Sequence, residues 1–161
     1  MAVSKILALA AATRRVGYVY FIGGQLKDWR VSDKAAKSTT EAAGQIQRWI
    51  NELKPDVVAT EKVGNSTKKS AKTRAIIAAM AYVASHNYLL DVSVTRPREY
   101  ENKYAEAAAL ARRYPDIAGW LPTKRRLFQT EPRNTVLFEA LALADEILRG
   151  PTPITLARAL G

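Results

Sequence analysis

The chain has 161 residues, of which 48% are hydrophobic and 25% are charged, so its composition is that of one folded globular domain and excludes general disorder. Lys and Arg total 25 against 15 Asp and Glu, and the resulting formal net charge of +10 favours a polyanionic partner such as nucleic acid. Cysteine is absent and His86 is the only histidine, which excludes thiolate zinc sites, cysteine nucleophiles and nucleases built on a histidine pair. Any hydrolytic chemistry must therefore use carboxylates and a hard metal ion.

The first apolar run extends from Ile6 to Ala12 and is bounded by Lys5 and by Arg14 and Arg15. It is too short to span a membrane and lacks the layout of a signal peptide. We therefore expect no membrane partner and a cytoplasmic protein.

The N-terminal residues predict three antiparallel strands. Apolar, β-branched and aromatic runs cover residues 5–12, 16–22 and 25–31. The polar turn Thr13-Arg14-Arg15 separates the first two runs, and Gly23-Gly24 provides the backbone freedom for a hairpin between the second and third.

Helices then alternate with two further strands. Apolar residues take a helical period between Ser38 and Leu53, with Ser38 or Thr39 as the N-cap, and the run 56–60 predicts a buried strand with Glu61 at its C-terminal edge. The remaining elements are a helix at 71–85 buried along most of its length, a strand at 89–94, an exposed helix at 99–113, an irregular segment at 114–130 and a helix from Pro132 through Leu148.

This order predicts an α/β domain with a mixed five-stranded sheet, in which three antiparallel strands are followed by parallel strands and helices flank both faces. Gly150-Pro151 stops the last helix. We therefore expect residues 1–150 to form the domain and residues 151–161 to form a C-terminal tail.

Four segments, taken in order, resemble the motifs of one nuclease family. They are residues 6–17 (ILALAAATRRVG), 55–61 (PDVVATE), 64–74 (GNSTKKSAKTR) and 138–144 (FEALALA). Over nearly its whole length the chain resembles the RuvC family of Holliday-junction resolvases, within the RNase H-like nuclease superfamily. The resemblance implies an RNase H-like fold, an endonuclease dependent on Mg²⁺ (which Mn²⁺ can replace), branched DNA as substrate, and a homodimer matching the two-fold symmetry of a four-way junction.

The resemblance assigns catalytic positions to Ala10, Glu61 and Glu139, the two glutamates as metal ligands. A catalytic Asp of the family falls at the position of Ala10, and the family often has a second acid or a histidine where this chain has Val136. Two glutamates alone are a poor platform for two divalent ions, so we expect this chain to be inactive or nearly so.

Two explanations of Ala10 are open: a natural pseudo-nuclease that binds without cutting, or an engineered replacement of Asp that traps a substrate. We favour the second, because the other motif residues remain. Glu131 or Asn134 could supply a missing ligand, whereas Asp145 falls on the far side of the helix from Glu139 and is expected to face solvent.

Ion pairing is the alternative role for both glutamates. Glu61 could pair with a surface lysine such as Lys62, and Glu139, in an otherwise apolar helix, could belong to a core salt bridge.

Basic residues with polar neighbours predict phosphate contacts. The predicted nucleic-acid-binding residues are Thr13, Arg14, Asn65, Lys68, Lys69, Lys72, Arg74, Lys124, Arg125 and Arg126. Trp120 and Phe128 either stack on an unpaired base or pack in the core. A structure-selective DNA endonuclease is the preferred function, with a nuclease acting on RNA or RNA–DNA hybrid and a non-catalytic nucleic-acid-binding module as alternatives.

Overall fold

The computed structural model describes residues 4–63, 68–96, 100, 102–122 and 132–149. Its centre is a five-stranded mixed sheet with the strand order β3-β2-β1-β4-β5. The strands are β1 Lys5–Ala12, β2 Arg15–Ile22, β3 Gln25–Ser32, β4 Val57–Glu61 and β5 Leu90–Val94. The first three pair antiparallel, whereas β4 pairs parallel with both β1 and β5, which confirms the predicted fold class.

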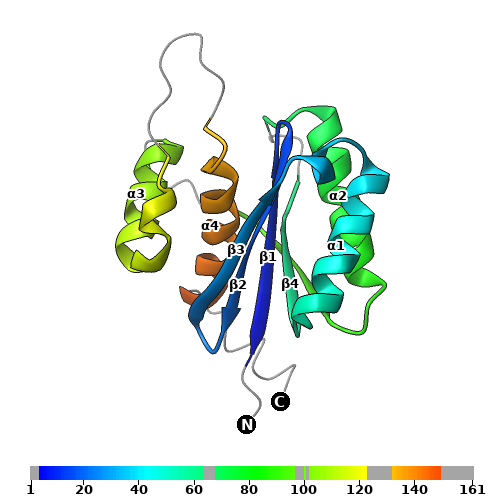
Figure 1. Cartoon of the computed structure of the whole chain (residues 1–161), viewed down its shortest axis with the longest axis horizontal. Helices are drawn as coiled ribbons and strands as arrows, with labels where there is room; N and C mark the ends of the chain where they lie inside the picture. The colour runs from blue at the N-terminus through cyan, green and yellow to red at the C-terminus, as the bar shows by residue number, and fades with distance from the viewer. Residues whose placement is uncertain (1–3, 64–67, 97–99, 101, 123–131, 150–161) are drawn as a thin grey trace.

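Helices cover both faces of this sheet (Figure 1). The α-helices are α1 Thr39–Leu53, α2 Ala71–Ser85, α3 Lys103–Arg113 and α4 Thr135–Arg149, and the 3₁₀ helices are η1 Lys34–Ala36 and η2 Pro115–Trp120. Figure 1 shows α1 and α2 on one face, and α4 on the other with α3 outside it. Within the described ranges, no helix has the length and apolar character needed to cross a membrane.

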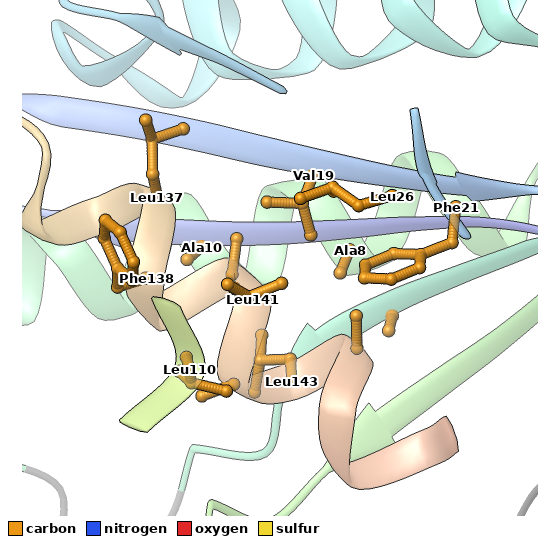
Figure 2. Packing of buried hydrophobic residues seen from close by; sticks show 14 of the residues in the cluster. Ala8, Ala10, Val19, Phe21, Leu26, Leu110, Leu137, Phe138, Leu141 and Leu143 are labelled. Atoms are coloured by element: carbon orange, nitrogen blue, oxygen red, sulfur yellow. The ribbon is translucent and has the colours of Figure 1, made fainter. Parts of the chain in front are cut away.

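The alternation of side chains along β1 divides the core into two clusters. Leu7 and Leu9 pack under α1 and α2, whereas Ala8 and Ala10 belong to the cluster under α4. Figure 2 shows Ala8 and Ala10 beside Leu141 of α4. Because β1 is covered on both faces, its sequence reads as a continuous apolar run.

The predicted turns and cap are confirmed. Gly23 and Gly24 both have positive φ, +59° and +79°, in the β2–β3 hairpin. Arg14 also has positive φ in the turn between β1 and β2, and the Ser38 hydroxyl accepts a hydrogen bond from the Glu41 amide at 3.0 Å at the start of α1.

Two helices differ from their predictions. The predicted helix at 99–113 begins at Lys103, because the Asn102 side chain caps the amides of Tyr104 and Ala105, and its Ala107 and Leu110 are buried rather than exposed. The helix expected from Pro132 begins at Thr135.

The prediction that α2 is buried along most of its length was wrong. The residues of α2 that are buried lie on one face and are Thr73, Ile76, Ile77, Met80 and Ala84. Ala75, Ala78 and Tyr82 are exposed. Alanine gives no signal of which side of a helix faces the core, and this is the reason for the error.

Candidate active site

Strand pairing puts Ala10 and Glu61 on neighbouring strands. The parallel register of β1 and β4 aligns Ala8 with Ala59, and Ala10 and Glu61 each stand two residues further along their strands. Residues two apart share a face of a sheet, and Ala8, Ala10 and Ala59 all belong to the cluster under α4. The two positions that the sequence resemblance connects therefore lie on neighbouring strands and on the same face.

Glu139 reaches this place from α4. It is 9% exposed, and the residues of α4 on both sides of it are buried and apolar. A carboxylate in such surroundings is costly unless a cation or hydrogen-bond donors balance it.

Lys69 supplies that cation. Its Nζ lies 3.3 Å from Oε2 of Glu139 and 3.7 Å from Oε1 of Glu61, and it donates a hydrogen bond to the carbonyl oxygen of Ala11 at 2.6 Å. A single ammonium therefore joins β1, β4 and α4. The ion-pairing alternative proposed for the glutamates is present here, with Lys69 rather than Lys62 as the lysine.

Arg96 is the second cation at the site. Its Nη1 lies 3.8 Å from Oε1 of Glu61 and 3.5 Å from Oε1 of Glu139, and its Nη2 pairs with the buried carboxylate of Glu106 in α3. The side chains of Lys69 and Arg96 are 17% and 23% exposed, and those of the three glutamates are each 11% exposed. We call these five side chains, Glu61, Lys69, Arg96, Glu106 and Glu139, the charged cluster.

Sequence reasoning missed Arg96 and Glu106. A usable signal existed for Arg96, because β5 is parallel to β4 with Val94 opposite Glu61, and Arg96 stands two residues beyond Val94. Glu106 carried no such signal, since only the packing of α3 brings it near β5.

The donor set around position 10 does not fit Mg²⁺. The side chain of Ala10 has no ligand atom. Its partner on β2 is Gly17, and a Cβ added at Gly17 would lie only 3.0 Å from Val136 Cγ1, so a side chain there would be crowded. Glu61 and Glu139 already have protein cations as partners. Among the described residues, no group of three or more acidic or histidine side chains is arranged to hold a metal ion.

The predicted phosphate contacts divide into two groups. Thr13, Arg14, Lys68, Lys72 and Arg74 are exposed. They lie at the edge of the sheet where β1 and β4 end, because Thr13 and Arg14 follow β1 and α2 begins after the connection from β4. Lys69 is the exception, since its ammonium points into the charged cluster.

The other predicted residues lie either outside the described part of the chain or outside the charged cluster. Asn65, Lys124, Arg125, Arg126, Phe128 and Glu131 lie outside the described residues, as does the predicted tail at 151–161. Asn134 lies in the turn before α4. Trp120 is 43% exposed, and its ring packs edge-on against that of Trp29 with a centroid distance of 5.0 Å.

Asp145 is buried, and the expectation that it faces solvent was wrong. Its carboxylate accepts hydrogen bonds at 2.7 Å from both Arg113 Nη2 and the Tyr114 hydroxyl, and Arg149 Nη1 lies 3.4 Å away. Because α3 packs against α4, the side of α4 opposite the sheet is also covered. Burial and the hydrogen bond to Asp145 raise the pKa of Tyr114.

No protein-family model matches the chain, and no curated protein sequence matches it significantly. Solved structures do match. Thermus thermophilus RuvC in complex with Holliday junction substrate superposes with a TM-score of 0.61 at 14% identity, over 92% of this chain and 97% of that one. The fowlpox virus Holliday junction resolvase gives 0.57 at 16% identity over 89% and 97%, and the yeast mitochondrial resolvase Ydc2 gives 0.51 at 10% identity over 88% and 76%.

These likenesses define the class of fold. The chain has an RNase H-like fold, with the mixed sheet and flanking helices predicted for it. Within that class, the arrangement of its strands and helices is similar to that of RuvC and other Holliday junction resolvases, which agrees with the fold that the sequence resemblance implied.

Proposed function

We propose that this chain binds branched DNA as a RuvC-type nuclease domain whose catalytic centre cannot cut the DNA as it stands. The observation that carries the proposal is the convergence of Glu61, Glu139 and position 10 at one edge of the sheet. Two of the structural neighbours, Thermus RuvC and fowlpox virus resolvase, are complexes with Holliday junction DNA, which supports branched DNA as the ligand.

Exposed cations around that edge support phosphate binding. Arg14, Lys68, Lys72 and Arg74 are exposed there, and α2 begins there with Ser70 as its N-cap. The first turn of a helix presents free amides and a partial positive charge, which favours an anion. The formal net charge of +10 strengthens the attraction of any polyanion.

The loss of cleavage follows from Ala10. A metal-dependent phosphodiesterase of this kind uses converging carboxylates as its metal ligands, and the centre of this chain has two, both paired with protein cations. Both explanations of Ala10, natural or engineered, therefore predict binding without cutting.

We further propose that two copies bind one junction. The exposed face of α2 carries the small side chains of Ala75 and Ala78, which allow close helix approach, together with Tyr82, which is 65% exposed. We assign the second copy to this face because small side chains let two helices approach closely. A two-fold dimer pairs the same patch on both protomers, which matches the two-fold symmetry of a four-way junction.

Competition binding in EDTA tests the proposed function. A labelled four-way junction is bound first and then displaced by unlabelled junction, linear duplex of the same sequence, RNA–DNA hybrid or single-stranded RNA, all at one salt concentration. We expect the junction to compete at least about tenfold better than the linear duplex, equivalent to about 1.4 kcal/mol. Equal competition by duplex contradicts junction recognition, and stronger competition by hybrid or RNA moves the RNA-directed alternative to first place.

A further inference from the structure

We propose that Lys69 is a built-in counter-ion of the charged cluster, which takes the place of a divalent metal ion between Glu61 and Glu139. The inference concerns the carboxylates on which the proposed function rests, but it is independent of DNA binding. Its tests use the protein alone.

The Lys69 ammonium contacts three oxygens. It donates hydrogen bonds to the carbonyl oxygen of Ala11 at 2.6 Å and to Oε2 of Glu139 at 3.3 Å, and it lies within ion-pair distance of Oε1 of Glu61 at 3.7 Å. These acceptors come from β1, α4 and β4, so the contact is made by the fold and not by neighbours in sequence.

Burial distinguishes this arrangement from a surface ion pair. The side chains of Glu61 and Glu139 are 11% exposed and that of Lys69 is 17% exposed. Two carboxylates so close together and so poorly hydrated repel each other unless a cation balances them. A divalent ion is one such cation, and here the lysine fills the same electrostatic role.

Arg96 supplies the second cation beside these carboxylates. The charged cluster holds three carboxylates and two cations, Lys69 and Arg96, so its formal charge is −1. Each of the three carboxylates therefore already has a protein cation beside it. The Lys69→Met variant makes the formal charge −2 and leaves the space of the ammonium free, so it should create a weak divalent-cation site.

The experiment compares divalent-metal binding by the unaltered chain, with Ala10 as in the sequence, and by Lys69→Met without DNA. Mn²⁺ binding is measured by electron paramagnetic resonance of the free ion, and the melting temperature is measured in EDTA and in Mg²⁺. Lys69→Arg, which keeps the charge, and Lys27→Met, which removes an exposed lysine of β3, are the matched controls.

We expect the unaltered chain, Lys69→Arg and Lys27→Met to bind no Mn²⁺ and to melt at temperatures independent of Mg²⁺. We expect Lys69→Met to melt roughly 5 °C lower in EDTA, to recover part of that loss in Mg²⁺ and to bind one Mn²⁺. Stoichiometric Mn²⁺ binding by the unaltered chain overturns the proposal even if Lys69→Met fails to fold. A folded Lys69→Met protein without any gain in metal binding also overturns it.

Failure of this proposal is separable from failure of the proposed function. Junction competition is measured in EDTA, where no metal takes part, and metal binding is measured without DNA. Either proposal can therefore fail while the other is supported.

Discussion

Lys69 Nζ lies 3.3 Å from Oε2 of Glu139, although the two residues are 70 positions apart in the chain. The contact joins the connection between β4 and α2 to α4, and the same ammonium donates a hydrogen bond to the Ala11 carbonyl of β1. Separate sequence motifs predict DNA binding for Lys69 and metal binding for Glu139. In the structure these two side chains are partners of each other.

Restoring a carboxylate at position 10 should be insufficient to give full nuclease activity. Ala10→Asp adds an acid beside Glu61 and Glu139, next to the Ala11 carbonyl that Lys69 already binds. We expect weak Mg²⁺-dependent cleavage of a labelled four-way junction by Ala10→Asp, and at least about tenfold faster cleavage by Ala10→Asp with Lys69→Met.

The control for this pair of variants is Glu61→Gln in the double-variant background, which should abolish cleavage and keep junction binding. If Ala10→Asp alone cleaves as fast as Ala10→Asp with Lys69→Met, then Lys69 does not compete with the metal. An absence of cleavage in every background would favour the pseudo-nuclease explanation of Ala10.

Removal of two exposed lysines should lower the salt dependence of DNA binding. Lys68 and Lys72 are exposed at the edge of the sheet beside the charged cluster. We expect Lys68→Ala with Lys72→Ala to weaken binding to every DNA sequence and to reduce the slope of log affinity against log salt by about 2. The matched control, Lys27→Ala with Lys37→Ala, removes the same charge from exposed positions elsewhere, and an equal change in slope there would show that only net charge matters.

A charge on the exposed face of α2 should prevent dimer formation. Ala78 is exposed, so Ala78→Arg can be accommodated in the folded monomer, but it places two arginines against each other in a two-fold interface. Light scattering after gel filtration should give the dimer mass for the unaltered chain and the monomer mass for Ala78→Arg, with unchanged melting of the monomer. A monomeric unaltered chain at all concentrations contradicts the proposed interface.

Replacement of Asp145 should destabilise the domain. The Asp145 side chain is 8% exposed and accepts hydrogen bonds from Arg113 and Tyr114. Asp145→Asn leaves Arg113 without its partner charge, and we expect a loss of about 2–3 kcal/mol in the free energy of unfolding by urea. Arg149→Ala, which removes a cation that is 55% exposed, should cost less than about 1 kcal/mol.

Some tyrosines should resist ionisation in the folded protein. Burial raises the pKa of Tyr18, Tyr20 and Tyr114, and hydrogen bonds to Asp28 and Asp145 raise those of Tyr18 and Tyr114 further. A folded-state pKa above the unfolded one gives stability that is complete below about pH 10 and is lost as the pH rises further. Alkaline titration followed by tyrosinate absorbance should therefore show part of the 7 tyrosines ionising only with unfolding.

The sequence was sufficient to predict the fold because its strands and turns carry strong local signals. The β-branched and aromatic run at 16–22, the polar turn before it and the pair Gly23-Gly24 after it indicate the hairpins, and Ser38 marks the start of α1. The exposed side of α2 was not predictable in the same way, since an alanine fits a buried or an exposed position equally well.

The candidate site was predictable only in its acidic part. Glu61 and Glu139 were identified from their motifs, and strand register accounts for the position of Ala10 beside Glu61. The role of Lys69 was not predictable, because a lysine in a basic loop has the same local sequence whether it faces solvent or turns inward. The same argument applies to Asp145, whose partners come from α3.

The position of α4 at the end of the described chain has a consequence for synthesis on the ribosome. Until α4 emerges, the sheet face that carries Ala8 and Ala10 has no cover, and Lys69 has no Glu139 to contact. The nascent chain therefore completes this core only after α4 has been translated. A premature stop before Thr135 should leave an apolar sheet face exposed to chaperones and proteases.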